Sequence, residues 1–243
     1  MIVVVCPGQG SQTPGFLTPW LEVPGLSDRL ERYSEAAGLD LAAHGTTSDA
    51  DTIRDTRVAQ PLIVAAGLLT LHVLLQGRRD DVGGIAGHSV GELTAAAAAG
   101  ILSEADAMSL VAERGRAMAD AAAITPTGMS AVIGADESEL LARLGELGLE
   151  PANFNGAGQI VVAGAVDALE ALGKEPPTGA RVIPLQVAGA FHTRYMEPAV
   201  DRLRSAAAAV QPTDPTLPIW TNHSGREVSG GREFLDLLVG QVS

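Results

Sequence analysis

The sequence predicts an α/β fold, in which a large domain built on a parallel sheet carries a smaller inserted unit. Short β-branched runs alternate with longer runs of helical composition, the order typical of a parallel sheet covered by helices. Residues 125–187 follow a separate strand–helix–strand–strand–helix–strand pattern. Aromatic residues make up only 3% of the 243 residues and apolar residues 46%, so aliphatic side chains must form the core. We place the large domain at 1–124 and 188–243.

The first strand is predicted by the β-branched run at residues 2–6, which Pro7 ends. Further on, Gly38 and Gly45 indicate turns, because glycine adopts backbone conformations that other residues avoid. These signals place one buried strand and a looped segment at the start of the large domain.

The middle of the large domain is predicted as helix, strand and two more helices. Residues 61–76 have helical composition, and Pro61 suits a first turn because its missing N–H is not needed there. A short strand ends at residues 85–86. The alanine-rich run 92–99 predicts the next helix, and Ser103 is the expected N-cap of another that runs to about residue 123.

The inserted unit is predicted from its apolar runs and turn residues. Asp136 is the expected N-cap of its first helix, since Glu139 follows three residues later as in a capping box. Residues 156–158, Gly-Ala-Gly, form the expected turn between its middle strands. The expected strands are 129–133, 151–155, 159–163 and 181–185, and the expected helices are 136–147 and 166–172. This order predicts a ferredoxin-like subdomain.

The large domain then resumes with a helix over residues 194–210, a strand over 217–220 and a last helix over 233–239.

Charge and cysteine content exclude several classes of function. The 29 acidic residues outnumber the 16 basic ones, for a net charge of −13, which argues against binding nucleic acid or anionic lipid. The single cysteine, Cys6, fits a reducing compartment. The N-terminal apolar run lacks a preceding basic region and is too short to span a membrane. We therefore expect a cytoplasmic protein, and no metal site, since Cys6 and the histidines lack ligand spacing.

The sharpest chemical signal is the sequence Gly-His-Ser-Val-Gly at residues 87–91, between a strand and an alanine-rich helix. This G-x-S-x-G pattern in that context is typical of a nucleophile elbow, in which a tight turn projects the serine hydroxyl. The N–H of Val90 then lies at a helix N-terminus, where it favours a negatively charged oxygen. An ordinary Gly/Ser turn is the alternative, but the flanking strand and helix favour Ser89 as a nucleophile.

A serine nucleophile needs a base, and the chain has five histidines. His192, ahead of a helix, and His223, in a turn, are about even candidates on spacing alone. His44 and His72 fit surface or packed roles, and His88 would point away from the serine at a tight turn.

Five motifs together are similar to those of the malonyl-CoA:acyl carrier protein transacylases and the acyltransferase domains of polyketide synthases. They are PGQGSQ at 7–12, GHSVGE at 87–92, RGRAM at 114–118, NFNG at 153–156 and GAFH at 189–192. The resemblance covers nearly the whole chain. It implies an α/β-hydrolase-like core with the inserted ferredoxin-like subdomain. It also implies transfer of a malonyl group from coenzyme A to a carrier-protein thiol, with no cofactor.

The resemblance also implies roles for individual residues. It assigns Ser89 as the nucleophile, His192 as its base, and the N–H groups of Gln9 and Val90 as the oxyanion hole. Arg114 corresponds to the arginine that binds the free malonyl carboxylate, a role suited to a planar guanidinium.

Three further residues are expected near the substrate. The resemblance places Gln60 near the active site and Asn155 among the substrate-binding residues, although Asn155 also fits a plain turn. Val90 and Phe191 point to malonyl rather than methylmalonyl units. Without the resemblance, Arg114 would be interpreted as a surface ion pair with Glu113 or Asp120.

Relatives in this resemblance continue past Ser243, and a main-chain carbonyl in that stretch orients their histidine. Here Glu197 and Asp201 are weak substitutes for it. Two other functions therefore stay open beside the transferase: a serine esterase or thioesterase, and a truncated domain that only binds a carrier protein.

Acyl carrier proteins are acidic in this resemblance, so docking on an acidic chain needs a local basic patch. The candidates are Arg78, Arg79, Arg202 and Arg204, each of which also fits ordinary surface charge.

Overall fold

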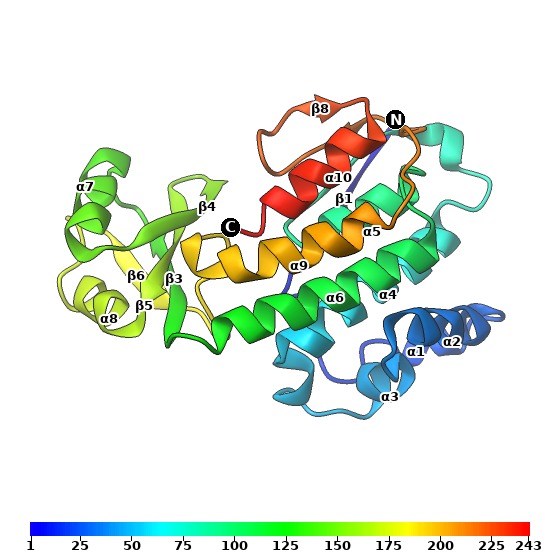
Figure 1. Cartoon of the computed structure of the whole chain (residues 1–243), viewed down its shortest axis with the longest axis horizontal. Helices are drawn as coiled ribbons and strands as arrows, with labels where there is room; N and C mark the ends of the chain where they lie inside the picture. The colour runs from blue at the N-terminus through cyan, green and yellow to red at the C-terminus, as the bar shows by residue number, and fades with distance from the viewer. The chain divides into compact units, whose positions relative to one another are not determined.

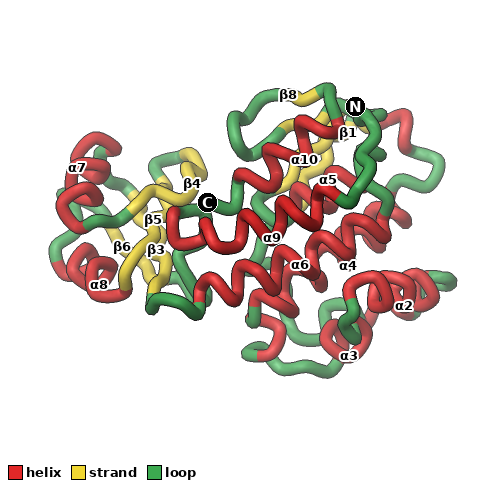
Figure 2. Tube along the Cα trace, viewed as in Figure 1, coloured by secondary structure: helices red, strands yellow, loops and turns green.

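The computed structural model describes all residues from Met1 to Ser243, which form two compact units (Figure 1). The first contains Met1–Arg116 and Asp201–Gln241, and the second contains Ala117–Val200 and Val242–Ser243. Each unit holds one four-stranded sheet (Figure 2). The predicted inserted segment, 125–187, lies wholly within the second unit, whereas domain boundaries at 124 and 188 stay a prediction.

The sheet of the first unit has the order β1-β2-β7-β8. Its strands are β1 (Ile2–Cys6), β2 (Val82–Gly87), β7 (Ile219–Trp220) and β8 (Glu227–Val228). β2 pairs in parallel with both β1 and β7, and β8 pairs antiparallel with β7. The predicted parallel core is confirmed, and the carboxyl ends of β2 and β7 lie side by side at one edge of it.

Helices account for most of the remaining residues of this unit, and two of them extend into the second unit. They are α1 (Thr18–Leu21), α2 (Leu26–Ala37), α3 (Leu41–Thr46), α4 (Thr56–Leu74), α5 (Gly91–Ala98), α6 (Glu104–Ala122), α9 (Glu197–Ala208) and α10 (Gly231–Gly240). Short 3-10 turns occupy Thr52–Arg54, Arg79–Asp81 and Arg194–Met196. α5 packs on β1 and β2, α4 packs on α5, and α2 and α3 pack on α4 (Figure 1). The predicted cap of α6 is confirmed, because the Ser103 hydroxyl accepts a hydrogen bond from the Asp106 N–H at 3.0 Å.

The prediction that Pro61 lies in the first turn of its helix is wrong. α4 begins at Thr56, so Pro61 lies inside it. The reason is Asp55, whose carboxylate accepts a hydrogen bond from the Arg57 N–H at 2.8 Å and starts the helix earlier.

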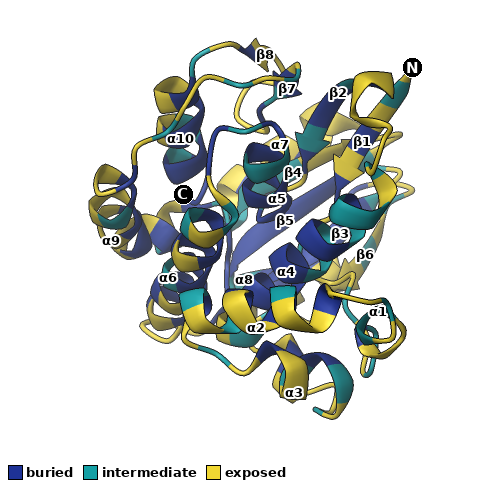
Figure 3. Cartoon of the chain, turned by 90° about the vertical axis from the view of Figure 1, so that its right-hand side faces the viewer, coloured by how far each residue is buried: buried dark blue, intermediate teal, exposed yellow.

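α4 is also long and apolar enough to cross a membrane by composition alone. Over half of that stretch is buried inside the protein (dark blue in Figure 3), as in the core helix of a globular domain.

The prediction of a turn at Gly45 is also wrong, and the helices α1, α2 and α3 in this part of the chain were not predicted. Gly45 lies within α3, where a Cβ would come within 2.3 Å of Leu17 Cδ1. Glycine is needed there for close packing rather than for a turn. The turn at Gly38 is confirmed, since this residue ends α2 with a φ of 64°.

The second unit contains the predicted ferredoxin-like subdomain. Its elements are β3 (Thr127–Ile133), α7 (Glu137–Leu147), β4 (Glu150–Gly156), β5 (Gln159–Ala165), α8 (Val166–Lys174) and β6 (Arg181–Pro184). The sheet order is β4-β5-β3-β6, and every pairing is antiparallel. Asp136 caps α7 as predicted, accepting a hydrogen bond from the Glu139 N–H at 3.0 Å. Buried Leu140, Val162 and Leu172 belong to the core between helices and sheet.

Candidate active site

Ser89 lies at a sharp turn between β2 and α5, and it has a φ of 52°, in the left-handed region that non-glycine residues rarely adopt. The glycines on both sides are required by close backbone contacts. A Cβ on Gly87 would lie 2.2 Å from the Gly91 carbonyl carbon, and one on Gly91 would lie 2.4 Å from the Cys6 oxygen. The predicted strand–turn–helix geometry of a nucleophile elbow is confirmed.

The loop after β1 lies directly against this turn. A Cβ on Gly91 would also come within 2.6 Å of the Pro7 oxygen, and one on Gly8 within 2.7 Å of His88 Nδ1. Neither the Gln9 N–H nor the Val90 N–H donates a hydrogen bond to another backbone group. The oxyanion hole formed by these two N–H groups stays a prediction.

Gln9 is further placed by its side chain, whose Nε2 donates to Thr56 Oγ1 at 3.4 Å. Its Oε1 is buried without a hydrogen-bond partner. Desolvation lowers the pKa of the His88 imidazole.

Arg114 projects from α6 into the interior and is only 1% exposed, so its interpretation as a surface ion pair is wrong. Glu113 instead bonds the exposed Arg116 and Arg202. The Arg114 guanidinium donates to Gln60 Oε1 at 2.8 Å and to Ser89 Oγ at 3.3 Å. The predicted residues Ser89, Gln60 and Arg114 therefore meet in one site.

A second hydrogen-bonded group surrounds the elbow and was not predicted. Gln241 accepts a hydrogen bond from Arg114 Nη2 at 3.1 Å through its Oε1, and its Nε2 donates to the Ser89 carbonyl at 3.1 Å and to Glu92 Oε2. Glu92, fully buried at the start of α5, also accepts from the Asn222 N–H at 2.6 Å. The available signal was position, because Asn222 follows β7 at the carboxyl edge of a parallel sheet, where sites commonly form.

The two buried charges in this site affect each other. Burial lowers the pKa of Arg114 to about 10, and the negative charge of Glu92 opposes that shift. Burial raises the pKa of Glu92. Hydrogen bonds from Asn222, Gln241 and Thr221 and the charge of Arg114 act in the opposite direction and lower it. Arg114 is therefore protonated at neutral pH, although it is enclosed by the protein.

The remaining predicted site residues lie in the second unit. His192 has a φ of 61°, and its N–H donates to the Val242 oxygen at 3.2 Å. Phe191 is buried beside it. Asn155 is exposed near the end of β4, and its Nδ2 donates to Gln159 Oε1 at 2.9 Å.

The other candidate side chains have local partners. His44 contacts Ser48 Oγ at 3.1 Å, and Arg204 donates to Asp201 at 2.8 Å. His223 and Glu197 are exposed. Of the expected basic patch, Arg78 pairs with Asp81 at 3.5 Å and Arg202 pairs with Glu113 at 2.8 Å.

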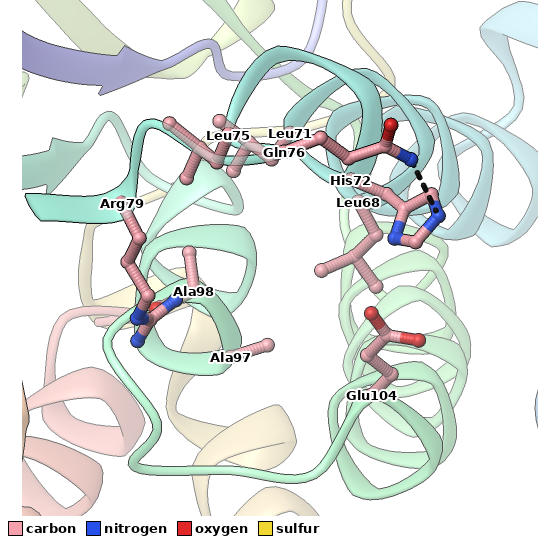
Figure 4. Close-up of a pocket in the computed structure, with 9 residues that line it drawn as sticks. All are labelled: Leu68, Leu71, His72, Leu75, Gln76, Arg79, Ala97, Ala98 and Glu104. Carbon is pink, nitrogen blue, oxygen red and sulfur yellow. Dashed lines mark hydrogen bonds between the residues drawn. The ribbon is translucent and has the colours of Figure 1, made fainter.

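A separate pocket of about 290 Å³ opens between α4, α5 and the start of α6 (Figure 4). Its polar groups bond to neighbouring protein atoms. Arg79 donates to the Ala98 oxygen at 2.9 Å, and Glu104 accepts from Tyr33 at 2.8 Å. His72 and Gln76 contact each other at 3.4 Å. The Arg79 and Glu104 contacts tie secondary-structure elements together. The chain has no group of three or more His, Cys, Asp or Glu side chains placed to hold a metal ion.

A strained serine on a strand–helix turn, inside an α/β core, defines the class of enzymes built on a nucleophile elbow. Residues 3–236 match the acyl transferase domain family, and the chain belongs to that family.

Individual relatives agree with this assignment. The chain is 51% identical to the malonyl CoA-acyl carrier protein transacylase of Mycobacterium tuberculosis, covering all of this chain and 81% of that protein. It is 34% identical to the protein of the same name from Escherichia coli, with coverage of 98% and 79%.

Solved structures give the same result. The crystal structure of the Mycobacterium tuberculosis protein superposes with a TM-score of 0.96 over 100% of this chain and 81% of that one, at 51% identity. A malonyl-transacylase solved in complex with the holo acyl carrier protein of a type II polyketide synthase superposes with a TM-score of 0.91 at 29% identity. The alignment covers 99% of this chain and 80% of that one.

Proposed function

We propose that this chain transfers a malonyl group from coenzyme A to the phosphopantetheine thiol of an acyl carrier protein. The observation that carries the proposal is the buried guanidinium of Arg114, 3.3 Å from Ser89 Oγ. Its hydrogen-bond partners Gln60, Ser89 and Gln241 are all uncharged. A buried cation without a directly bonded anion favours a substrate that carries a carboxylate. The names of the relatives support malonyl as that substrate.

The reaction proceeds in two halves. In the first, Ser89 Oγ attacks the thioester carbonyl, the O–C bond forms, the C–S bond breaks, and coenzyme A leaves as a thiol after receiving the serine proton. In the second, the carrier thiol attacks the serine ester, an S–C bond forms, the O–C bond breaks, and the proton returns to Ser89. This is a ping-pong reaction through a covalent intermediate.

His192 acts as the base and then the acid in both halves. In the first half it removes the proton from Ser89 and donates it to the departing thiolate. In the second half it removes the proton from the carrier thiol and returns it to Ser89. The N–H groups of Gln9 and Val90 stabilise the negative oxygen of each tetrahedral intermediate. Neither N–H donates to another backbone group, which supports this role.

Substrate selection and cellular role follow the same proposal. Val90 and Phe191 select malonyl rather than methylmalonyl units, and Asn155 is a substrate-binding residue. The product is malonyl-acyl carrier protein, which supplies fatty acid or polyketide synthesis. The reaction takes place in the cytoplasm and needs no cofactor. The acyl carrier protein docks through a local basic patch that includes Arg78, Arg79, Arg202 or Arg204.

Intact mass measurement tests this function. The protein is incubated with malonyl-CoA, and then with or without a holo acyl carrier protein. We expect a malonyl adduct on Ser89 that is stable alone and disappears when the carrier is added, with the malonyl mass appearing on the carrier. Ser89→Ala should give no adduct.

Two other outcomes would replace the proposal. Release of free malonate without carrier would identify a hydrolase, because water rather than a thiol would then attack the ester. Binding of carrier with no adduct at all would identify a domain that only binds carrier protein.

A further inference from the structure

The nucleophile of this chain occupies a backbone conformation that local sequence does not favour. Ser89 has a φ of 52°, and left-handed geometry costs free energy for any residue with a Cβ. Such a residue keeps this conformation only when surrounding contacts fix it. The contacts at the Ser89 peptide groups are therefore part of what places its hydroxyl.

Asn222 supplies the contact on the N-terminal side. Its Oδ1 accepts a hydrogen bond from the Ser89 N–H at 2.5 Å, and its Nδ2 donates to the Gly87 oxygen at 2.6 Å. One amide thus bonds the chain on both sides of His88. Asparagine suits this position because it combines a donor and an acceptor on a short side chain.

The sheet explains why Asn222 lies there. The parallel ladder between β2 and β7 pairs Ile85 with Ile219 and Ala86 with Trp220. Beyond these pairs β2 bends into the elbow, so its backbone leaves the ladder. The side chain of Asn222, two residues after Trp220, takes over the hydrogen bonding that the β7 backbone no longer provides.

Glu92 anchors the asparagine in turn. This fully buried carboxylate accepts the Asn222 N–H at 2.6 Å through Oε1, and its Oε2 accepts from Gln241 Nε2. Gln241 Nε2 also donates to the Ser89 carbonyl at 3.1 Å. The N–H and the C=O of Ser89 are therefore each bonded by a side-chain amide, from Asn222 and Gln241. Glu92 bonds the backbone N–H of Asn222 and the side-chain amide of Gln241.

We propose that Asn222, whose backbone N–H is anchored by Glu92, is a positioning residue for the nucleophile, and that its side-chain amide holds Ser89 in the left-handed conformation required for attack. The inference rests on the proposed function in taking Ser89 as the nucleophile. It does not depend on malonyl as the substrate, because any electrophile that Ser89 attacks meets the same backbone.

The test compares Asn222→Ala and Asn222→Asp with Ser224→Ala, a change at an exposed residue in the same turn. The aspartate variant keeps an acceptor for the Ser89 N–H but loses the donor to the Gly87 oxygen. It also keeps the size of the side chain, which protects against a variant that fails to fold. Circular dichroism melts establish that each variant is folded.

The first measurement is the rate at which an alkyl fluorophosphonate labels Ser89, followed by intact mass. The Oγ–P bond forms, the P–F bond breaks, fluoride leaves, and the serine proton is lost. We expect both Asn222 variants to label about 10- to 100-fold more slowly, the range that small displacements of a reacting group produce. Ser224→Ala should label at the wild-type rate.

The second measurement is steady-state malonyl transfer to holo acyl carrier protein. We expect kcat to fall by the same factor as labelling, with the KM for malonyl-CoA within about threefold, since Arg114 keeps its contacts. The inference would be overturned if folded Asn222 variants kept a labelling rate and a kcat within about twofold of the wild-type values. A raised KM at constant kcat would also overturn it. If the Asn222 variants label more slowly but even the wild-type protein transfers no malonyl, the positioning role stands and the proposed function fails.

Discussion

Replacing Arg114 by methionine should remove the preference for malonyl over acetyl thioesters. Methionine keeps much of the buried aliphatic volume but carries no charge and donates no hydrogen bond. A hydrogen bond to a charged group contributes about 1.5–3 kcal/mol, so two parallel bonds to a malonyl carboxylate contribute at least about 3 kcal/mol. Each 1.4 kcal/mol is about tenfold, which predicts a loss of at least about a hundredfold in kcat/KM for malonyl-CoA.

The assay measures kcat/KM for malonyl-CoA and acetyl-CoA with the same holo acyl carrier protein. Arg114 also contacts Ser89 Oγ, so its loss affects both substrates. The ratio of the two kcat/KM values cancels that shared effect and isolates recognition of the carboxylate. Arg116→Ala is the matched control, because Arg116 is exposed on the same helix and pairs with Glu113 at 3.2 Å.

A malonyl-to-acetyl ratio in Arg114→Met within about threefold of the unchanged protein would refute the carboxylate assignment. An equal fall for both substrates would mean that Arg114 acts on the nucleophile rather than on the substrate.

Three further predictions concern the elbow, the buried Glu92 and the N-cap of α7. Gly91→Ala should lower the free energy of unfolding by about 1–3 kcal/mol, because the new Cβ would lie 2.4 Å from the Cys6 oxygen, and an unchanged urea midpoint would contradict this. Glu92→Gln should gain stability relative to the wild-type protein as pH rises. Burial raises the pKa of Glu92, so the contribution of Glu92 to the free energy of unfolding is fully present below its unfolded-state pKa. That contribution is lost as pH rises through its folded-state pKa. Urea titrations across pH test this, and a stability difference independent of pH would contradict it. Asp136→Ala should lower the thermal midpoint of unfolding at neutral pH. Hydrogen bonds from the Ser138 hydroxyl and the Glu139 N–H stabilise the charged carboxylate and lower the pKa of Asp136 below 3.8. The difference in midpoint should therefore disappear as pH falls through that lowered pKa. A midpoint difference that persists at lower pH would count against that explanation.

Features encoded within a few residues could be predicted from the sequence. The elbow at Ser89 needs only a strand, two glycines and a following helix, all within one short segment. The cap at Asp136 and the turn after Gly38 likewise depend on neighbours in the chain. The ferredoxin-like unit was predictable because its strands and helices follow one another without interruption.

Only the tertiary structure decided the surroundings of the nucleophile. Arg114 could be a surface or a buried residue on local grounds, and its burial depends on Gln60 and Gln241, 54 and 127 residues away. Asn222 lies 133 residues from Ser89 and reaches it because β7 pairs with β2. Buried polar groups must find partners wherever the fold brings them, so their roles follow from pairings between distant segments rather than from local pattern.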